Sequence, residues 1–167
     1  MKKLSLLLTL LLTFSFLVLP VSAEEKGFAP VTSREITAEA IYLVNVDTGD
    51  VIYQKNAEQS RPPASLTKLM TAILAMENTP NLDTEILTYP LYVQDYLYLY
   101  QLEHGGVSSG NMRAGDQFSM RDYLYATLLP SANEAALTIA DHVGGSQANF
   151  VDMMNKRAQE LHATSTH

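Results

Sequence analysis

Residues 61–76 read RPPASLTKLMTAILAM, and this stretch decides the fold that the sequence predicts. Pro62 and Pro63 fix φ and stop any preceding helix before a new one begins. The pattern predicts a helix that opens near Ala64 or Ser65 and is buried on nearly every side. Its apolar residues recur at helical spacing at Leu66, Leu69, Met70, Ile73 and Leu74.

The same helix carries Ser65 and Lys68, three residues apart on one face. A serine hydroxyl attacks a carbonyl when a base takes its proton, and a lysine serves as that base when burial and a nearby cation lower its pKa. The positive end of the helix dipole favours negative charge on the Ser65 oxygen. The alternative is a surface helix on which Ser65 is an N-cap and Lys68 extends to water. The local pattern leaves both open.

A second polar segment, Ser131-Ala132-Asn133, lies between two predicted helices. The first helix covers residues 119–129 behind a capping-box sequence and is ended by Pro130. The second covers about residues 133–142, before a Gly-Gly pair. Short polar side chains on such a connection can face a cleft, where a hydroxyl relays protons and a carboxamide binds an amide. The alternative is that Ser131 or Asn133 caps the second helix.

Two stretches carry a family resemblance. Residues 63–71 (PASLTKLMT) and 128–136 (LLPSANEAA) closely resemble the first two motifs of the low-molecular-mass penicillin-binding proteins, the serine D-alanyl-D-alanine carboxypeptidases. The resemblance implies an α/β (α+β) fold of the β-lactamase/transpeptidase type, in which a helical cluster packs on an antiparallel sheet. Residues 40–46 and 51–55 read as two strands around an Asp/Gly turn and supply the first hairpin of that sheet.

The resemblance assigns a role to each matching residue. Ser65 would be the acylated nucleophile, and Lys68 its general base. Ser131 would pass a proton to the leaving D-alanine, and Asn133 would bind the peptide carbonyl of the substrate. The implied reaction removes the terminal D-alanine from peptidoglycan stem peptides, and β-lactams would acylate the same serine as inhibitors.

No cofactor or metal is implied by the resemblance. The chain has four histidines and no cysteine, and the histidines show no metal-ligand spacing. Its formal net charge of −7 argues against a nucleic-acid partner.

The third motif of the family, Lys-Thr-Gly or Lys-Ser-Gly, occurs nowhere in these 167 residues. In the family it lies on a later strand that supplies one donor of the oxyanion hole. Residues 35–167 are therefore expected to form the N-terminal part of a transpeptidase-like catalytic domain. The remaining strands, and any C-terminal region that associates peripherally with a membrane, would lie outside this sequence.

The motifs leave two alternatives open. A class A-like β-lactamase shares the Ser-x-x-Lys chemistry but typically has Asp where Ala132 stands, so the alanine favours the carboxypeptidase. A truncated, non-catalytic homologue that only binds peptidoglycan is favoured by the missing third motif.

The N-terminus predicts export. Residues 1–23 combine two lysines, an apolar run and small residues before a cleavage site after Ala23, which is the pattern of a signal peptide. Residues 24–34 read as a mobile leader. We therefore expect an exported protein of the cell wall or the outer face of the cytoplasmic membrane.

Tyrosines crowd residues 89–100, which read YPLYVQDYLYLY. We expect them to pack a helical subdomain and to bond through their hydroxyls. The alternative is an aromatic wall beside the cleft that contacts a glycan or a peptide stem.

Overall fold

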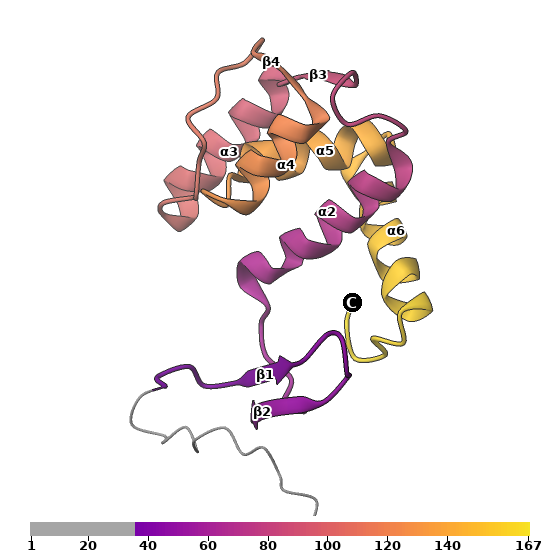
Figure 1. The fold of residues 1–167 in the computed structure, drawn as a ribbon. Helices are drawn as coiled ribbons and strands as arrows, with labels where there is room; N and C mark the ends of the chain where they lie inside the picture. Colours follow the sequence, from indigo (N-terminus) through magenta and orange to yellow (C-terminus); the bar gives the residue numbers. More distant parts are fainter. Residues whose placement is uncertain (1–35) are drawn as a thin grey trace, which may run out of the picture. The chain divides into compact units, whose positions relative to one another are not determined.

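The computed structural model describes residues 36–167. The predicted signal peptide, residues 1–23, and the predicted leader, residues 24–34, lie outside the described residues. The chain divides into two compact units, one ending at Glu58 and the other spanning Gln59–His167 (Figure 1). None of the helices within residues 36–167 is long and apolar enough to cross a membrane.

A β-hairpin forms the described part of the first unit. Strand β1 (Ile41–Val44) pairs antiparallel with β2 (Val51–Lys55), which confirms the predicted pair of strands. The ladder ends earlier than residue 46 because the Asn45 side chain accepts hydrogen bonds from the amides of Asp47 (3.0 Å) and Thr48 (3.4 Å). Such a local side-chain bond starts a turn in place of further pairing.

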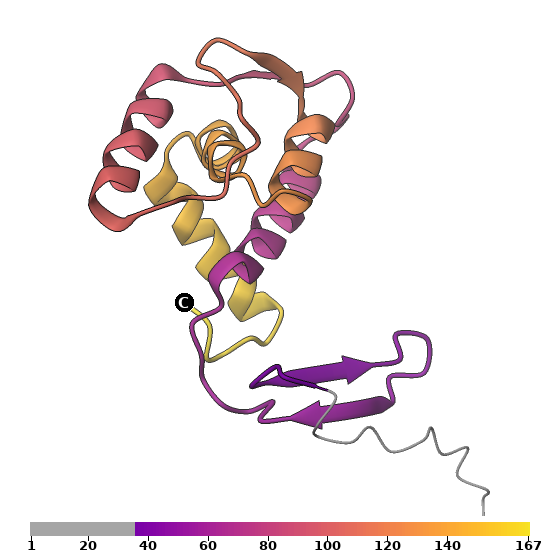
Figure 2. The same cartoon turned by 90° about the vertical axis from the view of Figure 1, so that its left-hand side faces the viewer.

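The second unit is mainly helical. Its central element is α5, which contacts all four other α-helices of the unit and is seen nearly end-on in Figure 2. Ala135 and Ile139 of α5 are fully buried, so the apolar side of this helix forms the middle of the core. The elements in chain order are η1 (Ala64–Leu66), α2 (Thr67–Asn78), β3 (Ile86–Thr88), α3 (Leu91–His104), β4 (Gln117–Ser119), α4 (Met120–Leu128), α5 (Asn133–Gly144) and α6 (Gln147–Glu160).

Two glycines make the sharp corner between α5 and α6. Gly145 adopts a left-handed conformation, with φ of 69°, which ends a helix at little cost for a residue without Cβ. A Cβ on Gly144 would lie 2.7 Å from the backbone nitrogen of Phe150. Because Phe150 is buried in the core, this close approach lets α6 pack directly on the end of α5.

Helix α2 is less buried than the sequence predicts. It buries Thr71, Ala72, Leu74 and Ala75 on the side that α4, α5 and α6 cover. In the described residues, however, Leu66 is 68% exposed and Leu69 is 55% exposed. The expectation of burial on nearly every side is therefore wrong here, because the apolar stripe is wider than the face that the three helices cover.

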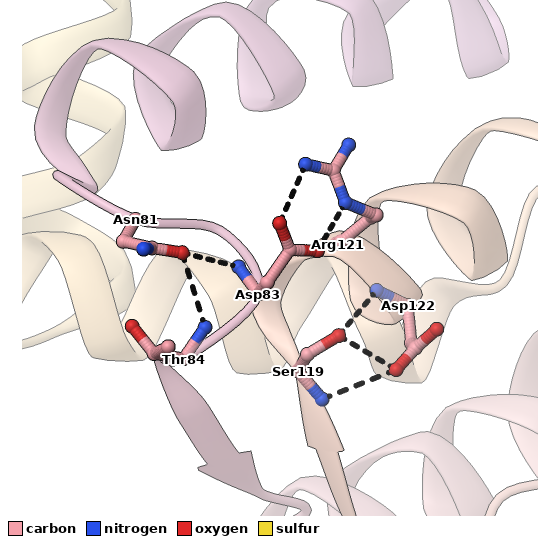
Figure 3. A network of polar contacts seen from close by, with 6 residues as sticks. All are labelled: Asn81, Asp83, Thr84, Ser119, Arg121 and Asp122. Carbon is pink, nitrogen blue, oxygen red and sulfur yellow. Dashed lines mark hydrogen bonds and ion pairs between the residues drawn. The ribbon is translucent and has the colours of Figure 1, made fainter.

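A capping box fixes the start of α4 (Figure 3). The Ser119 hydroxyl accepts a hydrogen bond from the Asp122 amide at 3.1 Å, and the Asp122 carboxylate accepts one from the Ser119 amide at 3.3 Å. Ser119 is also the last residue of β4, where it pairs with Ile86 of β3. The capping box that the sequence predicts thus joins a helix to a strand pair.

An ion pair ties the same region to the turn after α2. Arg121 binds the Asp83 carboxylate with two nitrogens, one of them at 3.0 Å, and the hydrogen bond from Arg121 lowers the pKa of Asp83. The Asn81 side chain accepts hydrogen bonds from the amides of Asp83 (3.0 Å) and Thr84 (3.3 Å) (Figure 3). The end of α2 and the start of α4 are therefore held together by a local polar network.

We expect Ser119→Ala to lower the free energy of unfolding by about 1 kcal/mol, because the change removes an N-cap acceptor. Chemical denaturation followed by circular dichroism measures this loss. Ser60→Ala, at an exposed serine in an irregular segment, is the matched control and should stay within about 0.5 kcal/mol of the natural protein. Equal stability of the two variants would contradict the role of the cap.

Candidate active site

Lys68 joins helix α2 to the connection between α4 and α5. Its amine donates to the Ser131 carbonyl oxygen at 2.7 Å, to the Ser131 hydroxyl at 2.9 Å and to Asn133 Oδ1 at 2.7 Å. An ammonium has three donors and no acceptor, so these three partners satisfy it completely. The structure thus brings both halves of the predicted site into direct contact.

Ser65 is connected to Lys68 through Ser131. The Ser131 hydroxyl donates to Ser65 Oγ at 2.8 Å while it accepts from the Lys68 amine. The sequence predicts that Lys68 reaches Ser65 along the helix face, but the hydrogen bonds of the described chain run from Lys68 to Ser131 and from Ser131 to Ser65. A hydroxyl that accepts at one side and donates at the other can relay a proton between its neighbours.

The backbone is strained at both ends of the Ser65–Ser131 hydrogen bond. Ala64 has a φ of 48° and Ser131 a φ of 60°, values that residues with a Cβ rarely adopt. Each such residue costs about 1–3 kcal/mol and persists only where the surroundings enforce it. Around Ser131, the Lys68 amine binds its carbonyl and the next amide, that of Ala132, donates to Ala126 at 2.9 Å.

The capping alternatives for these residues are wrong. Helix α5 has Ala132 as its N-cap and no side-chain capping bond, so neither Ser131 nor Asn133 caps it. Likewise, no side chain caps η1 or α2, and the Ser65 hydroxyl is bound by Ser131 instead. The polar side chains of both motifs therefore face one another and not the ends of their own helices.

Burial lowers the pKa of Lys68 from its usual value of 10.5, and the negative charge of Glu134 partly opposes this shift. Lys68 is half-buried, whereas Glu134 is only 3% exposed. A lower pKa increases the fraction of neutral amine, which is the form that can act as a base. Sequence reasoning missed Glu134, although a charged residue inside the apolar stretch 132–140 was a usable signal.

The site opens into a cavity of about 510 Å³. Ser65, Lys68 and Asn133 are among the polar residues that line it, and most of its apolar lining comes from α5 and α6. Tyr96 and Tyr100 of α3 also line it and are exposed, so for these two tyrosines the packing interpretation is wrong and the alternative of an aromatic wall beside the cleft is favoured. A mostly apolar cavity with a few convergent polar groups is the usual form of a small-molecule or peptide site.

The polar groups at this site suit nucleophilic chemistry. Within residues 36–167, no group of three or more His, Asp or Glu side chains is placed to hold a metal ion. The site contains the Ser65 hydroxyl, the Ser131 hydroxyl that connects it to Lys68, the Lys68 amine with its lowered pKa and the Asn133 carboxamide. This set can activate Ser65 as a nucleophile toward a carbonyl carbon.

The sequence model of the D-alanyl-D-alanine carboxypeptidase family, peptidase family S11, matches residues 26–167. The chain belongs to this family. It is 34% identical over 152 residues to the D-alanyl-D-alanine carboxypeptidase DacD of Escherichia coli, covering 87% of this chain and 37% of that protein. It is 33% identical over 165 residues to DacF of Bacillus subtilis, covering 96% of this chain and 40% of that protein.

Solved structures of the family share the fold. Penicillin-binding protein 6B from Escherichia coli superposes with a TM-score of 0.69 at 31% identity, covering 86% of this chain and 44% of that one. The Streptomyces K15 DD-transpeptidase superposes with a TM-score of 0.66 at 30% identity, covering 79% of this chain and 50% of that one. The predicted transpeptidase-like fold class is confirmed. The chain spans half or less of the length of these relatives.

The lowered pKa of Lys68 predicts a pH-dependent stability. Between the folded pKa and 10.5, the unfolded chain binds more protons at this residue, so the free energy of unfolding rises with pH. We expect the free energy of unfolding of the natural protein to rise relative to that of Lys68→Met as the pH increases from about 7 to about 10. Urea unfolding of both proteins at each pH measures the difference, and a flat or falling difference would contradict the shift.

Proposed function

We propose that the complete protein is a serine-type D-Ala-D-Ala carboxypeptidase that removes the terminal D-alanine from peptidoglycan stem peptides. The observation that carries this proposal is the chain of hydrogen bonds from Lys68 through Ser131 to Ser65. Membership of the D-alanyl-D-alanine carboxypeptidase family supports the choice of substrate.

In the first half of the reaction, Ser65 Oγ attacks the carbonyl carbon of the terminal peptide bond. Its proton passes to Ser131, which hands a proton to the neutral Lys68 amine, so that Lys68 is the general base. Ser131 then returns a proton to the amine of the leaving D-alanine as the C–N bond breaks. The product is an ester between Ser65 and the shortened stem peptide.

In the second half, water attacks the ester carbonyl and loses its proton to the same relay. The C–O bond to Ser65 breaks, the shortened peptide leaves with a free carboxylate, and Ser65 regains its proton. Asn133 has a fixed orientation because its Oδ1 accepts from Lys68. Its Nδ2 hydrogens point the other way along the amide plane, and we propose that they bind a peptide carbonyl of the substrate.

This function requires a location where peptidoglycan is present. We therefore propose that the protein is exported to the outer face of the cytoplasmic membrane or the cell wall, in agreement with the predicted signal peptide. β-Lactams would be inhibitors, since their strained amide would acylate Ser65 in place of the peptide bond. Cell-wall maturation is the process to which such trimming belongs.

We expect incubation with a penicillin to add the mass of one penicillin to the complete protein, and Ser65→Ala to abolish this adduct. Intact-mass spectrometry followed by peptide mapping measures both results. Ser60→Ala is the matched control, because it removes a hydroxyl from the same region of sequence, and it should keep the adduct. An adduct that survives in Ser65→Ala would contradict the assignment of the nucleophile.

Turnover of a chromogenic cephalosporin separates the carboxypeptidase from a class A-like β-lactamase. The buried Ala132 stands between Ser131 and Asn133, where β-lactamases of that class typically have Asp. We expect stoichiometric acylation followed by slow release. Rapid catalytic hydrolysis would favour the β-lactamase, and failure of a correctly folded complete protein to release D-alanine or bind penicillin would favour a non-catalytic homologue.

A further inference from the structure

Glu134 is a buried carboxylate that the proposed reaction does not use. Its Oε1 accepts hydrogen bonds from the Ser109 hydroxyl at 2.7 Å, from the Gly110 amide at 2.6 Å and from the Met112 amide at 3.5 Å. Burying a carboxylate is costly unless hydrogen bonds compensate for the lost water. All three donors come from one loop, residues 108–112, between α3 and β4.

The same loop touches the catalytic connection at two further points. The Asn133 amide donates to the Ser108 carbonyl oxygen at 3.0 Å. A Cβ built on Gly110 would lie 3.3 Å from the Cβ of Ala132, so the loop backbone packs tightly against the residue between Ser131 and Asn133. Loop 108–112 therefore supports residues 132–134, which directly follow Ser131.

Glu134 is also the charged group that acts on Lys68. The groups that accept hydrogen bonds from the Lys68 amine, on Ser131 and Asn133, are neutral, and so is Ser65, which Ser131 binds in turn. Around the cavity, α3 contributes tyrosines, and α6 contributes Gln147 with apolar side chains. None of the described residues that line the cavity carries a carboxylate, and Glu134 acts on Lys68 from its buried position beside the cavity.

We propose that Glu134 is a positioning residue of the active site, whose carboxylate anchors loop 108–112 and thereby holds Ser131 and Asn133 in place around Lys68. The inference rests on the proposed function for its kinetic consequence. Ser131 needs this support because its left-handed backbone, with φ of 60°, is unfavourable for a residue with a Cβ and must be enforced from outside.

The carboxylate form is needed for both effects. An ionised carboxylate accepts several hydrogen bonds at once, and charge-assisted bonds are about twice as strong as neutral ones. A glutamine amide at the same place keeps one acceptor oxygen. Its other group, NH₂, is a donor, and the amide carries no negative charge. Glu134→Gln therefore weakens the loop anchor and removes the negative charge near Lys68 with almost no change of shape.

The test compares Ser65 acylation by a fluorescent penicillin, as a function of pH, in the complete natural protein and in Glu134→Gln. We expect the maximal acylation rate to fall roughly tenfold or more, because a small misplacement of catalytic groups has effects of this size. We also expect the acidic limb of the pH profile to move to lower pH. Without the Glu134 charge, Lys68 loses its proton more easily, so its neutral form is present at lower pH.

Two control variants make the result specific. Glu160→Gln changes a carboxylate to an amide on the exposed end of α6, where Glu160 binds Arg157, and should leave both the rate and the pH profile unchanged. Ser109→Ala removes one of the three donors to Glu134 and keeps the charge. It should lower the rate less than Glu134→Gln does and leave the acidic limb in place.

Hydrogen exchange tests the anchor independently of activity. We expect the amides of Gly110 and Met112 to exchange faster in Glu134→Gln than in the natural protein, with the amides of α5 beyond Glu134 unchanged. If the natural protein does not react with penicillin, the proposed function fails, and the exchange of these two amides still decides the role of Glu134. Unchanged exchange, or a rate and an acidic limb equal to those of the natural protein, would overturn the proposal.

Discussion

The arrangement of the candidate active site depends on the three hydrogen bonds that the Lys68 ammonium donates. Its hydrogen bonds link helix α2, which follows the η1 turn that carries Ser65, to the α4–α5 connection, which carries Ser131 and Asn133. The apolar contacts of α2 with α5 bring these segments near one another, but such packing is not directional. The three hydrogen bonds of the ammonium fix the position of the α4–α5 connection relative to α2. The Ser131 hydroxyl then lies 2.8 Å from that of Ser65.

This arrangement places opposing demands on the same lysine. In the role of base that we propose, Lys68 needs a lowered pKa, which its partial burial supplies. As a structural link, it needs acceptors on every side, and hydrogen bonds to the charged form favour that form. The Glu134 carboxylate also favours the charged form. The net effect is a lysine whose pKa is lowered from its usual value, which favours the transfer of its proton to and from Ser131 that we propose.

Much of the site followed from short-range patterns, and the rest depended on tertiary structure. The spacing of Ser65 and Lys68, the capping box at Ser119 and the helix after Ser131 are local features, and the structure contains each of them. Three features were not predictable locally. The hydrogen bonds of Ser131 to Lys68 and Ser65 depend on the left-handed backbone at Ser131. The hydrogen bonds of Glu134 come from a loop more than twenty positions away in the sequence. The exposure of Leu66 and Leu69 depends on which helices cover α2.

A crystal structure of the complete protein acylated by a penicillin would show whether Lys68 and Ser131 act together on Ser65. We expect continuous density between Ser65 Oγ and the opened lactam carbonyl, with the Lys68 amine still bonded to Ser131 and Asn133 and the Ser131 hydroxyl next to the Ser65 ester oxygen. An adduct on another residue, or a Lys68 side chain turned away from Ser131 while Ser65 is acylated, would contradict it.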